Sequence, residues 1–140
     1  MISAMEISTS ALVAQRVRLN AIASNLANMS TTRNENGDVE PFQARHVVFQ
    51  TDDEVSTGYG ASGVKIASVE TEDVEPNYKY QPGHPLAIRQ GPRRGYVAYP
   101  RVNMTEQFVD ALEATRAYEA NIGVIETSKT IGAQTLRILG

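Results

Sequence analysis

Proline is confined to the middle of this 140-residue chain. All six prolines lie between residues 41 and 100, and seven of the ten glycines lie between residues 33 and 102. Because proline breaks helix interiors and glycine loosens them, the proline-free ends predict helices and the middle predicts strands and turns. The sequence therefore predicts an α+β fold in which long terminal helices form a coiled-coil assembly domain. Its parts are an N-terminal helix in residues 1–32, a small β-rich domain in residues 33–102 and a C-terminal helix in residues 103–140.

The N-terminal helix is predicted from apolar residues at heptad spacing. Leu12, Leu19 and Leu26 lie seven residues apart, and alanines between them allow another helix to approach closely. Ser3 and Glu6 fit the S-x-x-E capping box, which predicts that Ser3 is the N-cap of this helix.

The C-terminal helix is predicted from a longer and more regular pattern. Positions from Met104 to Leu139 alternate in steps of four and three residues, and most of them are apolar. This alternation is the pattern of a coiled coil. Asn103 is a suitable N-cap, and the acidic residues early in the helix suit its dipole. A helix of this extent would be roughly 55 Å long, which is too long to be buried inside one small globule.

The two apolar stripes need other helices to cover them, because a long helix with one uncovered apolar face is marginal. Either the helices pair with each other as part of an ordinary core, or they pack against other molecules. Pairing would leave a second stripe exposed at Val124, Ile131 and Ile138, and exposed apolar stripes mark association surfaces. We therefore predict self-assembly. The predicted assembly seam comprises Met5, Leu12, Leu19, Ile22, Leu26, Met104, Phe108, Ala111, Tyr118, Ile122, Ile125, Leu136 and Leu139.

The middle segment predicts short strands separated by turns. Strand-forming residues gather in residues 42–49 and 63–70, and tyrosine-rich runs lie at residues 78–80 and 96–99. Pro-Gly and Gly-Pro pairs between the last two runs predict turns. Residues 52–60 are predicted to form a loop.

Composition and motifs exclude several classes of function. A net charge of -3 and a pI near 5.4 argue against nucleic-acid binding, and the absence of cysteine excludes disulfides and thiolate metal sites. No apolar run approaches the ~20 residues of a membrane helix, and the N-terminus does not resemble a secretory signal peptide. No HExxH, GxSxG or P-loop motif is present, and His46 and His84 lie far apart in the sequence. We therefore predict a protein that is not an enzyme and has no catalytic residues, cofactor or metal.

A basic stretch follows the turn at residues 83–85. Arg89, Arg93 and Arg94 with nearby glycines have the composition of an anion-binding loop, although most loop arginines are simply solvated. A further interpretation is that these arginines face an acidic run on a neighbouring subunit and set the register of that contact. The acidic run comprises Glu70, Glu72, Asp73 and Glu75.

Motifs along most of the chain resemble those of bacterial flagellar rod and hook proteins. Residues 10–28 read SALVAQRVRLNAIASNLAN, which is similar to the N-terminal signature of this family, and residues 116–129 contain RAYEAN and ETSK, which are typical of its C-terminal helix. YQPGHP at residues 80–85 and GYVAYPRVN at residues 95–103 resemble the proximal rod members in particular. The link at residues 86–94 departs from the family pattern, because it is longer and basic where the family has a short acidic link.

The resemblance implies a structural subunit of the proximal rod in the flagellar basal body. Members of this family are exported unfolded by the flagellar type III apparatus without a cleaved signal and stack into the periplasmic rod, where their terminal helices surround the export channel and transmit torque. The implied partners are other copies of the chain, adjacent rod proteins and the export apparatus, without nucleic acid or membrane insertion. A soluble coiled-coil adaptor or chaperone-like protein is the alternative, and an enzyme that uses the loop at His84 is a third. The resemblance also assigns polar contacts that fix helix register to Gln15, Asn20, Asn25 and Asn28.

Overall fold

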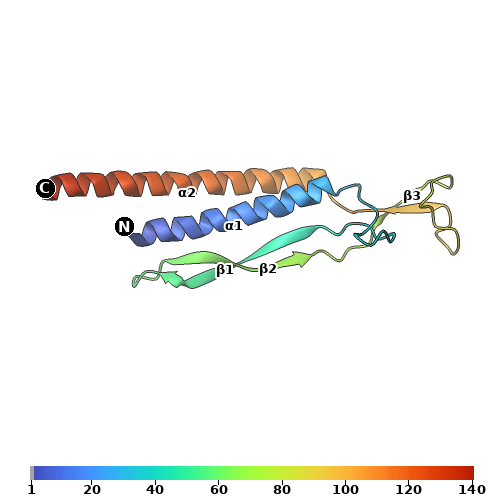
Figure 1. The fold of residues 1–140 in the computed structure, drawn as a ribbon, viewed down its shortest axis with the longest axis horizontal. Coiled ribbons are helices and arrows are strands. Elements are labelled where there is room, and N and C mark those ends of the chain that lie inside the picture. The colour runs from blue at the N-terminus through green and yellow to red at the C-terminus, as the bar shows by residue number, and fades with distance from the viewer. Residues whose placement is uncertain (1) are drawn as a thin grey trace.

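The protein is an elongated α+β molecule in the computed structural model, which describes residues 2–140 (Figure 1). A long helix at each end and small antiparallel sheets between them confirm the predicted α+β class. The coiled-coil assembly domain predicted for the two helices stays a prediction. The elements are helix α1 (Ile2–Ala27), strands β1 (Arg45–Ser56), β2 (Ser62–Thr71), β3 (Asn77–Tyr80) and β4 (Tyr96–Tyr99), and helix α2 (Met104–Leu139).

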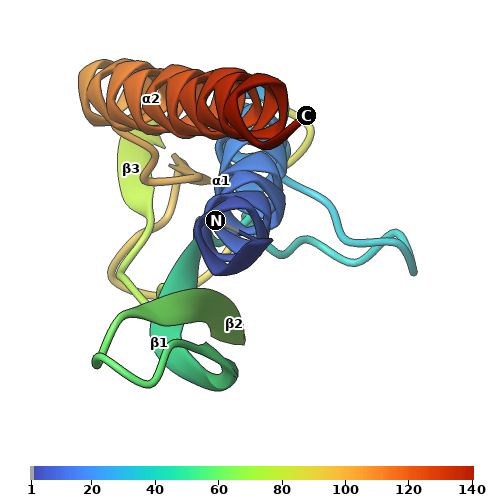
Figure 2. The same ribbon diagram turned by 90° about the vertical axis from the view of Figure 1, so that its left-hand side faces the viewer.

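Helix α2, helix α1 and the β1–β2 hairpin lie in successive layers (Figures 1 and 2). Helix α1 is the middle layer, because it contacts α2 as well as both strands of the hairpin. Among the elements that the structure describes, α2 contacts only α1. The two helices therefore pair within one molecule, while most of the surface of α2 stays uncovered.

The contacts between the layers are made by small side chains. Ala14 and Ile22 of α1, Ala44 before the hairpin and Ala114 of α2 are all buried. Small side chains allow two helix backbones to approach closely. The interior is thin, and most of the large apolar residues of α2 lie exposed outside it.

The start of α2 was predicted correctly and the start of α1 was not. Asn103 caps α2, because its Oδ1 accepts hydrogen bonds from the backbone N–H groups of Thr105 at 3.0 Å and Glu106 at 3.4 Å. The predicted N-cap at Ser3 is wrong, because the helical backbone of α1 already includes Ile2 and Ser3. The side chains of residues 1–3 lie outside the described part of the chain.

The β1–β2 hairpin is longer than its sequence suggests. Strand β1 continues to Ser56, so most of the loop predicted at residues 52–60 is wrong. Asp52 lies opposite Gly63, and its carboxylate is 3.7 Å from Nζ of Lys65. Cross-strand pairs of this kind stabilise a sheet, which outweighs the low strand propensity of aspartate.

Strands β3 and β4 form a second small sheet that projects beyond the helices (Figure 1). Within the described chain, these strands contact no other helix or strand. Gly95 precedes β4 with φ +84°, and a Cβ atom at this position would lie 2.7 Å from Cε2 of Tyr80. The left-handed backbone and the close ring together require glycine here.

Gly95→Ala should therefore destabilise the β3–β4 sheet by about 2–4 kcal/mol, because alanine adds both backbone strain and a steric clash. Gly91→Ala is a matched control: its φ is +94° but nothing lies within 4 Å, so only the backbone cost of about 1–2 kcal/mol applies. Hydrogen exchange of the Gln81 amide, which donates to the Gly95 carbonyl at 2.8 Å, measures the local stability. Equal effects of the two variants would show that the Tyr80 ring moves aside without cost.

Candidate assembly surface

Helix α2 presents a row of mostly small and polar side chains to α1. These are its less exposed positions, and they alternate in steps of four and three residues. Because α2 contacts only α1 among the described elements, this row is the seam within the molecule. It consists of Gln107, Ala111, Ala114, Tyr118, Asn121, Ile125, Ser128 and Gly132.

The predicted assembly seam and this row share some residues of α2 and differ at others. Ala111, Tyr118 and Ile125 lie in the row, whereas Phe108 and Ile122 lie one position beyond it and are 54% and 37% exposed. Close approach of the helices selects small side chains for the inner row, so the larger ones are displaced outward. Among the other residues of the predicted seam, Ile22 is buried. The remaining residues of α2 in that seam are exposed: Met104, Leu136 and Leu139. The remaining residues of α1 are half-buried: Met5, Leu12, Leu19 and Leu26.

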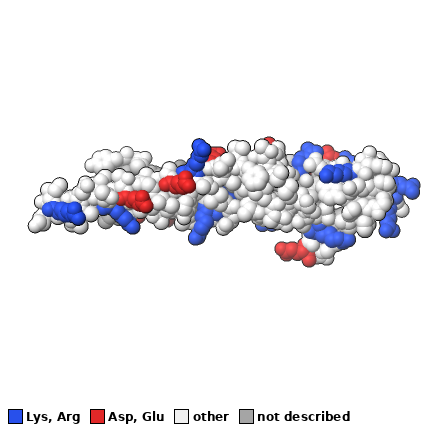
Figure 3. All heavy atoms as spheres, turned by 90° about the horizontal axis from the view of Figure 1, so that it is seen from above, with Lys and Arg blue, Asp and Glu red and all other residues white. Residues whose placement is uncertain are grey.

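Large apolar side chains of α2 lie exposed on both sides of the inner row. We call Phe108, Ile122 and Leu136 the first flank, and Val124, Ile131 and Ile138 the second flank. These six side chains are between 37% and 85% exposed, and the surface over the C-terminal half of α2 carries few charges (Figure 3). Apolar surface arranged in this way is typical of an interaction site.

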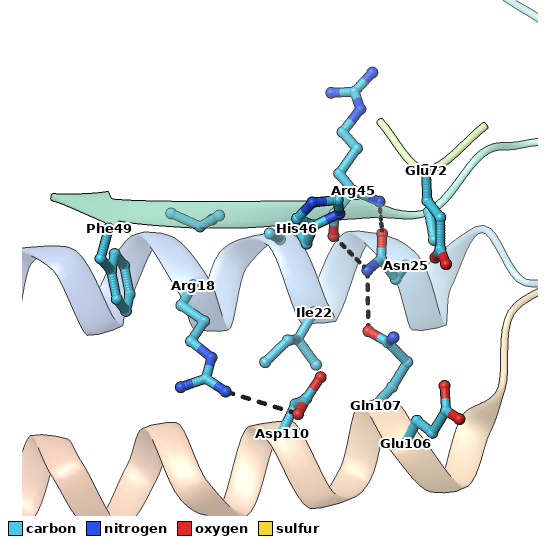
Figure 4. A pocket seen from close by; sticks show the side chains of 13 residues that line it. Arg18, Ile22, Asn25, Arg45, His46, Phe49, Glu72, Glu106, Gln107 and Asp110 are labelled. Atoms are coloured by element: carbon cyan, nitrogen blue, oxygen red, sulfur yellow. Dashed lines mark hydrogen bonds and ion pairs between the residues drawn. The ribbon is translucent and has the colours of Figure 1, made fainter. Parts of the chain in front are cut away.

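A buried asparagine joins all the layers of the molecule (Figure 4). Asn25 of α1 is 2% exposed. Its Nδ2 donates to the Arg45 carbonyl at 2.8 Å and to Oε1 of Gln107 at 2.9 Å, and its Oδ1 accepts from the Arg45 N–H at 2.8 Å. These hydrogen bonds satisfy the buried amide and connect α1 to the start of β1 and to α2.

The other predicted register residues have different surroundings. Asn20 is exposed on α1. Asn28 bonds locally, donating from Nδ2 to the Ser24 carbonyl at 2.9 Å and accepting from the Thr31 hydroxyl at 3.1 Å. Oε1 of Gln15 is buried and accepts no hydrogen bond from the described residues. A register role for these four residues remains a prediction, for which Asn25 has the strongest structural basis.

Ion pairs between the helices were missed in the sequence. The Arg18 guanidinium of α1 lies 3.7 Å from Asp110 and 3.3 Å from Glu113 of α2. From the sequence, these acidic residues were expected only to interact favourably with the dipole of α2. No rule based on sequence spacing relates residues so far apart in the chain. These ion pairs can therefore be identified only from the three-dimensional structure.

The two histidines lie in separate places and make local contacts. Nε2 of His46 is 3.5 Å from a carboxylate oxygen of Glu70 on the exposed side of the hairpin, and Nδ1 of His84 accepts the Leu86 N–H at 3.1 Å. Across residues 2–140, no group of three or more metal-ligating side chains is found. No described helix is both long and apolar enough to span a membrane.

Comparisons with known proteins agree over nearly the whole chain. Residues 5–33 match the family described as flagella basal body rod protein, and residues 93–138 match the family described as flagellar basal body rod FlgEFG protein C-terminal. The flagellar basal-body rod protein FlgC of Borreliella burgdorferi is 36% identical, covering 98% of this chain and 96% of its own length. FlgC of Salmonella typhimurium is 38% identical, covering 99% and 97%, and FlgC of Bacillus subtilis is 34% identical, covering 96% and 95%. The chain belongs to the FlgC family of flagellar basal-body rod proteins.

Membership of the FlgC family confirms the resemblance seen in the sequence motifs. The chain is a structural protein of the bacterial flagellar basal-body rod and assembles with other rod components. The two family matches fall on α1 and on β4 with α2, and neither covers the β1–β2 hairpin. The features shared across rod proteins are therefore those of the terminal helices.

Proposed function

We propose that this FlgC-family chain polymerises into the proximal rod through the two flanks of α2. One observation carries this proposal: large apolar side chains lie exposed on both sides of the row that α1 covers. One neighbouring subunit covers each flank, so every copy joins two others and the terminal helices close around the export channel. The resulting continuous packing of helices transmits torque along the rod.

The remaining parts of this proposal rest on family membership. The chain leaves the cytoplasm through the flagellar type III export apparatus without a cleaved signal and assembles in the periplasm. Residues 1–32 and 103–140 act as the assembly segments, and residues 33–102 form the outer part of the subunit. The adjacent rod proteins and other copies of the chain are its partners.

A soluble adaptor with a single partner is the alternative function. Such a protein needs one apolar face, because one partner covers one side of a helix. Two flanks on opposite sides of the inner row favour contacts with two neighbours instead. Discrete complexes of fixed stoichiometry, without incorporation into rods, would support the adaptor.

Cysteine labelling tests the proposed packing directly, since the natural chain has no cysteine. Ile122→Cys places a thiol on the first flank and Val124→Cys places one on the second. Both thiols should react rapidly with a maleimide in the isolated chain and roughly tenfold or more slowly in basal bodies, because the core of an interface excludes water. Tyr59→Cys is the control, because Tyr59 is fully exposed in the hairpin turn and should react rapidly in both. Equal labelling of the flank thiols in both states would refute the proposal.

A further inference from the structure

Two surface loops of the molecule are each held by an arginine of their own chain. In the basic link at residues 86–94, Arg93 hydrogen-bonds and ion-pairs with Glu75, so the sequence-based hypothesis that these two residues meet across subunits is wrong. In the loop between α1 and β1, Nη1 of Arg33 donates to the Gly37 carbonyl at 2.7 Å. This second loop contains the one Asn-Gly pair of the sequence, at residues 36–37.

An asparagine that precedes glycine is prone to lose its side-chain amide. The backbone nitrogen of the glycine attacks Cγ of the asparagine and forms a C–N bond, and the side-chain nitrogen leaves as ammonia with the proton of the glycine N–H. Water then opens the resulting succinimide ring at either of its two carbonyl–nitrogen bonds, which yields aspartate or isoaspartate. Glycine favours ring closure because it has no Cβ beside the attacking nitrogen and lets the backbone rotate freely. Asn36 is exposed to the water that this reaction consumes.

The folded turn engages the nitrogen that would attack. The Gly37 N–H donates to the Asn34 carbonyl at 3.0 Å, and Gly37 has φ +83°. A bond from residue i to residue i+3 that is followed by a glycine of positive φ is the pattern of a type I turn with a bulge. The pairing of Arg33 with Val39 closes this turn. Asn36 therefore lies in a turn whose backbone is fixed on both sides.

The side chain of Asn34 holds the same turn from inside. Its Oδ1 accepts from the N–H groups of Asn36 and Asp38, both at 3.0 Å. Its Nδ2 donates to a carboxylate oxygen of Glu40 at 2.9 Å. Asparagine commonly stabilises turns by hydrogen bonds of this kind to the backbone. Ring closure requires the backbone between Asn36 and Gly37 to rotate and the Gly37 N–H to be released, and the bonds of Asn34 oppose both changes.

We propose that Asn36 is the deamidation site of this chain and that Asn34 protects it by holding the turn. The reaction then proceeds only from the small population in which the turn has opened, because ring closure needs the freed glycine nitrogen. Either product weakens the turn, since the new carboxylate is added beside Glu35, Asp38 and Glu40 and like charges repel. This chemistry is independent of how subunits pack in the rod.

Mass spectrometry of the purified chain after prolonged incubation at mildly alkaline pH tests the assignment of the site. In guanidinium chloride, Asn36 should deamidate faster than every other asparagine, because none of the others precedes glycine. In the native chain, with folding verified by circular dichroism, its rate should be roughly tenfold or more lower, because the turn must first open. Equal rates in the two states, or a faster reaction of another asparagine in guanidinium chloride, would overturn the proposal.

Asn34→Ala tests the protection itself. The variant loses the side-chain bonds of the turn, so deamidation of Asn36 in the folded chain should become roughly tenfold faster, about the factor that one hydrogen bond contributes. The rate in guanidinium chloride should stay the same. Glu35→Ala is the matched control, because Glu35 is exposed in the same turn and its side chain is not among those that hold the turn. Equal rates for these two variants in the folded state would show that Asn34 gives no protection.

Gly37→Ala tests the chemical route in the unfolded chain, where the positive φ of Gly37 no longer matters. A Cβ beside the attacking nitrogen should slow deamidation of Asn36 in guanidinium chloride roughly tenfold or more. An unchanged rate would mean that water attacks the side-chain amide directly. Because direct hydrolysis does not need the glycine nitrogen, that result would overturn the protective role of the turn as well.

Discussion

Replacement of Asn25 by leucine is expected to lower the free energy of unfolding of the subunit by about 2–5 kcal/mol. Leucine fills a similar volume but makes no hydrogen bond, so it leaves the Arg45 N–H, the Arg45 carbonyl and Oε1 of Gln107 without the partner that they have now. An unsatisfied buried polar group costs about 1–3 kcal/mol. Because Asn25 borders a groove that is open to water, hydration offsets part of this cost. Urea unfolding followed by circular dichroism measures the change.

Asn20→Leu is the matched control, because Asn20 lies on the same helix and is exposed. Its effect should stay within about 0.5 kcal/mol, as for most surface substitutions. Asn25→Asp tests the direction of the hydrogen bonds. It keeps an acceptor for the Arg45 N–H but places a carboxylate oxygen against two other oxygen acceptors, so it should also destabilise the subunit. Equal stabilities of the Asn20 and Asn25 variants would show that the buried amide contributes nothing.

The helices could be predicted from the sequence because their signals are local. The absence of proline, the heptad spacing and the cap at Asn103 all act within a few residues of one another, and each predicts helix without reference to the rest of the chain. The tyrosine-rich strands at residues 78–80 and 96–99 were found for the same reason. The family motifs then added a function that these local rules do not contain.

The pairing of the helices could not be predicted in detail, because it depends on backbone distance. Heptad counting selects large apolar residues, and it placed Phe108 and Ile122 in the predicted assembly seam, which stays a prediction. The contact with α1 instead selects the neighbouring row, where Ala114 is fully buried. The contact of Arg18 with Asp110 and the three partners of Asn25 depend in the same way on tertiary structure.

The two helices differ in how much surface they leave for partners. Helix α1 is covered by α2 and by the hairpin, and its most exposed positions are mainly polar or small, with Val13 as the main exception. Among the elements that the structure describes, only α1 covers helix α2, and the outer positions of α2 carry large apolar residues. Most of the large exposed apolar side chains therefore lie on α2. Assembly should therefore respond far more strongly to changes on α2 than to changes on the outer side of α1.

The double substitution Ile131→Gln with Ile138→Gln is accordingly expected to abolish rod formation. Ile131 and Ile138 are 48% and 85% exposed in the isolated subunit, and glutamine is a good helix former, so the subunit itself should stay folded. Covering an isoleucine in an interface contributes about 1.5–3 kcal/mol. Loss of both side chains should lower the association constant roughly 10²- to 10⁴-fold. Motility and the presence of rods in isolated basal bodies provide the readout.

Thr127→Gln with Thr130→Gln is the control for this change, because these threonines lie on the same part of α2 and are already polar and exposed. The control should form rods, since it removes no large apolar side chain from either flank. Circular dichroism of both purified double variants separates loss of assembly from loss of helix. Normal rods from the isoleucine variant would mean that the second flank stays in contact with water after assembly. In that case the contacts between subunits must lie elsewhere, because an interface cannot lose two buried isoleucines without losing affinity.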